Sequence, residues 1–177
     1  AAGDGVGDPL IAAQGNDAGG SAAGKTYLML AKDITAEMKG HTFDLSNASY
    51  SFVGEESFDS AGARVASAGD VDGDGFDDLI IGAPLNNDGG ADAGKTYLML
   101  SSAITAQAEG HTFDLSSASY SFVGQAAGDN SGHWVASAGD VDGDGEDDLL
   151  IGAYRWDVDT AMDSQEGKTY LMLSSAI

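Results

Sequence analysis

The chain has 177 residues, enough to bury one sizeable core, and its 29 acidic and 7 basic residues give a formal net charge of −22. This negative charge argues against nucleic acid and against an anionic membrane surface as partners. The absence of cysteine excludes a disulfide framework and a thiolate zinc site. No apolar run is long enough to span a bilayer, so we expect no membrane insertion.

An internal repeat organises the chain. Gly-Lys-Thr-Tyr-Leu-Met-Leu occurs at 24–30, 94–100 and 167–173. Residues 24–54 and 94–124 differ at only 7 of 31 positions, so we expect these two segments to share one backbone conformation. The repeat predicts three units within a single region 1–177, with approximate bounds 1–60, 61–130 and 131–177.

The first unit begins inside an acidic segment. With an offset of 70 residues, 3–8 aligns with 73–78. Asp4 and Asp8 then match two aspartates of the later copy, and Val6 matches the residue between them. This segment is a partial version of the metal loop described below, with Asp4, the carbonyl of Val6 and Asp8 as its candidate ligands.

Each full unit predicts four short strands, here called A to D. Residues 65–68 and 79–83 form an A–B hairpin around an acidic loop, and short aliphatic runs next to Gly-Ala indicate buried strands. Strand C follows at 95–100, 101–110 is a loop or a single helical turn, and D lies at 118–123. Further copies are expected at 48–53 for D, 135–153 for A–B and 168–173 for C. The chain therefore contains B-C-D, A-B-C-D and A-B-C.

The acidic loops at 70–78 and 140–148 carry carboxylates at positions 1, 3, 5 and 9 and glycine at position 6. So many like charges repel one another unless a cation binds between them. Ligands that are all hard oxygens favour calcium over zinc or copper. The predicted ligands are Asp70, Asp72, Asp74, Asp78 and the carbonyl of Phe76, and Asp140, Asp142, Asp144, Asp148 and the carbonyl of Glu146.

These loops differ from an EF-hand, which carries a glutamate at position 12 between two helices. Position 12 is Ile81 or Ile151, each inside a predicted strand. We therefore expect the loop to close at position 9. Asp77 and Asp147, at position 8, are expected to face solvent. The alternative is an acidic turn that binds no metal.

The segment 65–84, Val-Ala-Ser-Ala-Gly-Asp-Val-Asp-Gly-Asp-Gly-Phe-Asp-Asp-Leu-Ile-Ile-Gly-Ala-Pro, resembles the FG-GAP repeat of integrin α-subunit β-propellers and their bacterial relatives. The resemblance implies propeller blades of four antiparallel strands with calcium in the A–B loop. The chain departs from the pattern where the Phe-Gly of the repeat is replaced by Ala61-Gly62 and Ser131-Gly132.

An all-β fold of about three blades, the outer two incomplete, cannot close a ring that needs ~4–8 blades. We expect it to be part of a larger propeller, or to associate with copies of itself that complete a propeller or a filament. Since loops of this kind fill at millimolar calcium, the resemblance and the loops together predict an extracellular or cell-surface location.

The predicted function is a calcium-binding module for adhesion, surface assembly or protein–protein interaction, and no catalytic constellation is visible, so we do not expect an enzyme. Two alternatives are the non-catalytic propeller of a larger secreted enzyme and a glycan-binding propeller. Residues that depart from the repeat are the candidates for contact with a protein or glycan surface ligand; for the first two named here, a variation in packing is the favoured alternative. These candidates are His133, Trp134, Arg155 and Trp156.

Overall fold

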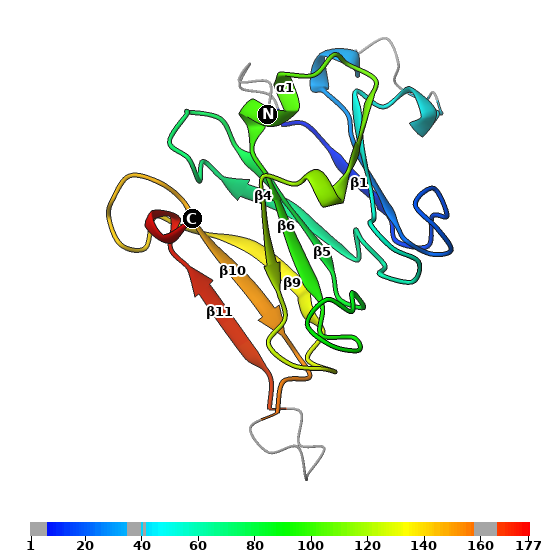
Figure 1. The fold of residues 1–177 in the computed structure, drawn as a ribbon. Coiled ribbons are helices and arrows are strands. Elements are labelled where there is room, and N and C mark those ends of the chain that lie inside the picture. Colours follow the sequence, from blue (N-terminus) through cyan, green and yellow to red (C-terminus); the bar gives the residue numbers. More distant parts are fainter. Residues whose placement is uncertain (1–6, 35–39, 41, 158–165) are drawn as a thin grey trace.

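The computed structural model describes residues 7–34, 40, 42–157 and 166–177, which form an all-β structure. Three sheets follow one another in chain order, and they do not close into a ring (Figure 1). The predicted all-β arrangement of part of a propeller is therefore confirmed. Within the described residues, no helix has the length and apolar character needed to cross a membrane.

The second sheet is a complete blade, and its four strands pair in antiparallel order as predicted. In chain order they correspond to A, B, C and D. They are β4 Arg64–Gly69, β5 Asp78–Ala83, β6 Lys95–Met99 and β8 Tyr120–Val123.

The outer sheets are incomplete in the way the repeat predicted. The first contains strands B, C and D, and the third contains A, B and C, again with antiparallel pairing. The strands of the first are β1 Leu10–Ala13, β2 Lys25–Leu28 and β3 Tyr50–Val53. Those of the third are β9 Ser131–Gly139, β10 Asp148–Ala153 and β11 Lys168–Met172.

The connection between β6 and β8 contains a strand that the sequence did not predict. The expected single helical turn is α1, Ser101–Thr105, and after it β7, His111–Asp114, joins the first sheet and pairs with β3 in parallel. The second repeat thus adds a fourth strand to the first blade. Short 3₁₀ turns complete the connections: η1 Ala31–Asp33, η3 Leu45–Asn47, η4 Leu115–Ser117 and η5 Ser174–Ala176.

The core consists of two apolar layers, one on each face of the second sheet. Leu79 and Ile81 of β5 pack into the layer shared with the first sheet, whereas Ile80 packs into the layer shared with the third. Successive side chains of a strand point to opposite faces, so an unbroken aliphatic run suits a strand buried on both sides. All six residues of β5 are buried. This packing holds the acidic loops at one end of adjacent sheets.

Candidate calcium loops

Each acidic loop joins two antiparallel strands, β4 to β5 and β9 to β10. The chain reverses within nine residues and needs left-handed backbone at the glycine of position 6. Gly75 has a φ of 89° and Gly145 a φ of 98°. A side chain at either position would be strained, which explains the glycine in both copies.

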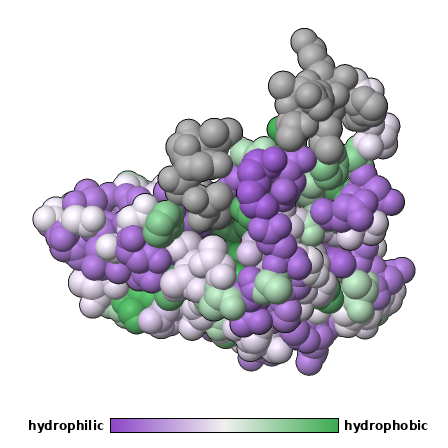
Figure 2. All heavy atoms as spheres, turned by 90° about the horizontal axis from the view of Figure 1, so that it is seen from above, coloured by the Kyte–Doolittle hydropathy of each residue, from purple (hydrophilic) through white to green (hydrophobic). Residues whose placement is uncertain are grey.

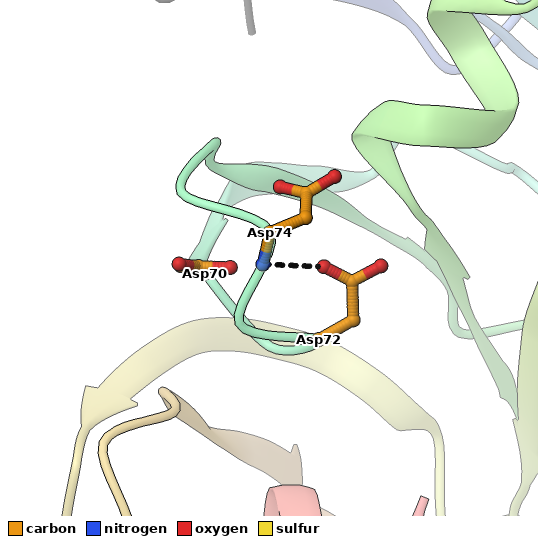
Figure 3. Close-up of side chains that lie close together, drawn as sticks. All are labelled: Asp70, Asp72 and Asp74. Carbon is orange, nitrogen blue, oxygen red and sulfur yellow. Dashed lines mark hydrogen bonds between the residues drawn. The ribbon is translucent and has the colours of Figure 1, made fainter.

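The loop brings the carboxylates of positions 1, 3 and 5 together. In the first loop, carboxylate oxygens of Asp70, Asp72 and Asp74 lie within 4.8 Å of one another (Figure 3). The second loop gathers Asp140, Asp142 and Asp144 within the same limit. Seen from above, hydrophilic residues are spread over the surface, with pale and hydrophobic residues between them (Figure 2).

Backbone N–H groups of the loop orient these carboxylates. Asp70 accepts a hydrogen bond from the N–H of Gly75 at 2.9 Å, and Asp72 accepts one from that of Asp74 at 3.2 Å. Asp74 in turn accepts from the N–H of Phe76 at 2.9 Å. The second loop repeats all three contacts at 3.0 to 3.2 Å. Two separate stretches of sequence therefore build the same arrangement of carboxylates.

One oxygen of this group has no hydrogen-bond partner. Asp70 Oδ1 is buried and accepts no hydrogen bond within the described part of the chain. A buried acceptor without a partner is costly, and this one belongs to a cluster of like charges. The ion pairs seen among the described residues involve Lys32 and Lys95, and neither pairs with these loops. A cation held by the three carboxylates would give the buried oxygen a partner and would also neutralise the repulsion among the like charges.

The aspartate of position 9 ties its loop to the following strand. Asp78 accepts hydrogen bonds from the N–H of Val71 at 3.0 Å and of Ser101 at 2.8 Å, and it is fully buried. Burial raises the pKa of Asp78 to about 6. Asp148 accepts the equivalent hydrogen bonds from the N–H groups of Val141 and Ser174. The bond from Ser174 is the largest of the contributions that lower the pKa of Asp148.

Position 9 therefore has a clear structural role, whereas its role as a metal ligand stays a prediction. Asp78 and Asp148 are not members of the clusters of three carboxylates. The backbone carbonyls of Phe76 and Glu146 also remain predicted ligands.

Two serines missed by the sequence analysis support the loops from a neighbouring strand end. The hydroxyl of Ser101 donates to Asp74 Oδ2 at 3.0 Å, and that of Ser174 donates to Asp144 Oδ2 at 3.2 Å. The sequence does contain a signal for this role, because the same segment, Leu-Ser-Ser-Ala-Ile, follows strand C in both copies, at 100–104 and 173–177.

The partial loop at the start of the chain is described only in part. Asp4 and Val6 lie outside the described residues. Asp8 accepts a hydrogen bond from the N–H of Ala31 at 2.7 Å, which matches the contact between Asp78 and Ser101. Asp8 therefore makes the hydrogen bond expected of a position 9 aspartate. Ala31 stands where Ser101 stands in the second unit, and alanine has no hydroxyl to donate to a loop carboxylate.

The two full loops are joined by Asp147, which was expected to face solvent. That expectation is wrong, because Asp147 Oδ2 accepts a hydrogen bond from the N–H of Asp70 at 2.9 Å. The N–H of Asp147 also donates to the carbonyl of Asp70 at 2.8 Å. Asp77 does lie exposed, accepting a bond from the hydroxyl of Ser67. The difference arises because the third sheet places Asp147 against the first loop.

Two of the candidate partner-binding residues, His133 and Trp134, contact side chains from other parts of the chain. Trp134 is 58% exposed, and the guanidinium of Arg64 lies 4.1 Å from the centre of its ring. His133 lies 4.3 Å from the ring of Tyr154, and burial lowers its pKa. Trp134 and Tyr154 line an open groove of about 490 Å³ together with Lys168.

Arg155 and Trp156 follow Tyr154 at the end of β10. Arg155 is exposed, and Trp156 is partly covered by Lys168, whose ammonium lies 5.0 Å from the ring centre. Neither residue lines the groove beside Trp134. A binding role for these four residues stays a prediction.

Stacked sheets of three or four strands, two of which carry an acidic loop in their A–B hairpin, define this protein as part of a β-propeller built from repeated units. The FG-GAP repeat model matches residues 61–99 and 131–172, so two segments of this chain are FG-GAP repeats. It is also 36% identical over 89 residues to integrin alpha-PS2 of Drosophila melanogaster. The alignment covers 48% of this chain but only 6% of that integrin's length.

Proposed function

We propose that this chain is a calcium-stabilised propeller module that acts outside the cell in protein–protein interaction, such as adhesion or surface assembly, and has no catalytic role of its own. The observation that carries the calcium assignment is the paired clusters of three carboxylates. The unpartnered oxygen of Asp70 and the purely oxygen-based ligand set support it.

The interaction role rests on the repeat family and on the similarity to an integrin α chain. When bound, calcium would neutralise the acidic loops and hold the A–B hairpins in register. In the first loop, Asp70, Asp72 and Asp74 would hold the ion, and Ser101 orients Asp74 through its hydrogen bond. An extracellular location would provide millimolar calcium, which weak sites of this kind require.

Calorimetric titration of the metal-free protein with calcium is expected to give two bound ions per chain. Asp72→Ala should remove one of them and Asp142→Ala the other, since each deletes the middle carboxylate of one cluster. Asp77→Ala is the matched control, because it removes an exposed aspartate outside the cluster and should leave two ions bound. A stoichiometry that does not change in the two cluster variants would contradict the assignment.

A further inference from the structure

The outer edge of β8 carries the same sequence as a strand edge that is occupied elsewhere in the molecule. Residues 50–53 in β3 and 120–123 in β8 both read Tyr-Ser-Phe-Val. Strand β3 pairs with β2 on one side and with β7 on the other. Strand β8 pairs with β6 on one side, and within the described residues no strand pairs with its other side.

Burial of the two strands differs accordingly. Tyr50 is 4% exposed and Phe52 is fully buried. In β8, Tyr120 is 41% exposed and Val123 48%. Since the four side chains are identical, the difference comes from what covers each strand. An unpaired edge with exposed apolar side chains is a ready template for another strand.

The partner of β3 shows what such a strand contributes. Strand β7 has the sequence His-Thr-Phe-Asp, and its Phe113 stacks on Phe52 with ring centres 5.2 Å apart. On the opposite face, the hydroxyls of Ser51 and Thr112 are hydrogen-bonded at 2.9 Å. The outer edge of β3 therefore pairs with a strand that places an aromatic side chain opposite Phe52 and a hydroxyl opposite Ser51, which fixes the register of the pairing.

A hollow beside β8 matches the place that Phe113 fills beside β3. In the first layer, Phe113 belongs to the buried cluster that contains Phe52, Ile81, Tyr97 and Met99. The corresponding residues of the second layer line an apolar groove of about 390 Å³ instead. They are Phe122, Ile151, Tyr170 and Met172.

We propose that the edge of β8 accepts, as a parallel strand, the His-Thr-Phe-Asp segment of a further FG-GAP repeat. The register follows from β3 and β7, so the incoming threonine faces Ser121 and the incoming phenylalanine enters the groove beside Phe122. This proposal does not depend on calcium binding. It identifies the surface on which the array of blades continues.

The aspartate that ends the incoming segment has the same backbone conformation whether or not the segment is paired. The same motif occurs at 41–44, where Asp44 has φ −85° and ψ 117° and accepts a hydrogen bond from the N–H of Ser46. In the paired copy, Asp114 has φ −84° and ψ 129° and accepts the same bond from Ser116. The extended backbone at this aspartate is therefore present before pairing, and a residue that is already ordered loses less conformational entropy on binding.

A register-specific crosslink tests the proposal, and the natural absence of cysteine makes it clean. The full chain with Ser121→Cys is mixed with a synthetic peptide of residues 107–118 that carries cysteine in place of the threonine matching Thr112, activated as a mixed disulfide. We expect covalent adduct at least on the order of tenfold faster than with Ser116→Cys, an exposed serine away from the edge. Mass spectrometry measures the adduct.

Replacing the peptide's phenylalanine with serine should reduce the rate to that of the Ser116→Cys control. The experiment is repeated with calcium and with chelator, so that loss of metal and loss of strand pairing are distinguished. Equal rates at Ser121 and Ser116 would overturn the proposal. Self-association of the unmodified chain that Phe43→Ser abolishes would support it, because the His-Thr-Phe-Asp segment of a second copy would then occupy the edge.

Discussion

Removal of calcium with a chelator is expected to lower the melting temperature of this protein by roughly 10–20 °C. A site filled to about a hundredfold over its Kd stabilises the folded state by about 2.7 kcal/mol, so two such sites contribute about 5 kcal/mol. For a domain of this size, each 1 kcal/mol shifts the melting temperature by about 2–4 °C. The physical cause is the repulsion among Asp70, Asp72 and Asp74, and among their counterparts, once the ion is gone.

Differential scanning calorimetry in excess calcium and in excess chelator measures this shift. Asp72→Ala should retain about half of it, because the second loop is intact. Asp77→Ala removes a charge from the same loop but none from the cluster, and it should retain the full shift. Equal melting temperatures with and without calcium would refute a stabilising metal.

Lys95→Met is expected to destabilise the fold by about 3 kcal/mol, the lower end of the range for breaking a buried ion pair. The side chain of Lys95 is 9% exposed, and its ammonium lies 2.7 Å from Glu55 and 2.8 Å from Asp88. Tyr97 also donates to Glu55, at 2.9 Å. Because Glu55 follows β3 while Lys95 lies in β6, the pair couples the first two sheets, and its loss leaves a largely buried carboxylate without a cation.

Urea denaturation compares this variant with its counterpart in the third sheet. Lys168 is hydrogen-bonded to the neutral side chain of Gln125 in an exposed position, so Lys168→Met should cost less than about 1 kcal/mol. Adding Glu55→Gln to Lys95→Met should recover part of the loss, since the largely buried carboxylate is then neutral and only the half-exposed Asp88 is left without its cation. Equal destabilisation by the two lysine variants would show that burial of the ion pair is not the cause.

The hairpins and their acidic loops could be predicted because the information lies within short segments. The aliphatic run of β5, the glycine at position 6 and the spacing of Asp70, Asp72 and Asp74 are each visible in fewer than ten residues. The second copy keeps the same aspartate and glycine positions and a similar aliphatic run, so each feature occurs twice. Exact strand ends at 64, 78 and 120 differed slightly from prediction, as strand boundaries depend on pairing partners.

The features that were missed depend on contacts between repeats. Strand β7 is four residues long and pairs in parallel with β3, about 60 positions earlier, so neither segment signals the pairing alone. Ser101 and Asp147 reach loops that belong to other parts of the chain. Their residue types fit a polar surface equally well, and only the stacking of the sheets gives them a role.

The central claim is that the clustered aspartates of each hairpin loop bind one calcium ion. The most direct measurement is a crystal structure grown with calcium, with an anomalous difference map calculated from data that carry the calcium signal. We expect one peak in each loop, about 2.3–2.6 Å from oxygens of Asp70, Asp72 and Asp74 or of Asp140, Asp142 and Asp144. Ordered loops with no anomalous peak at saturating calcium would contradict it.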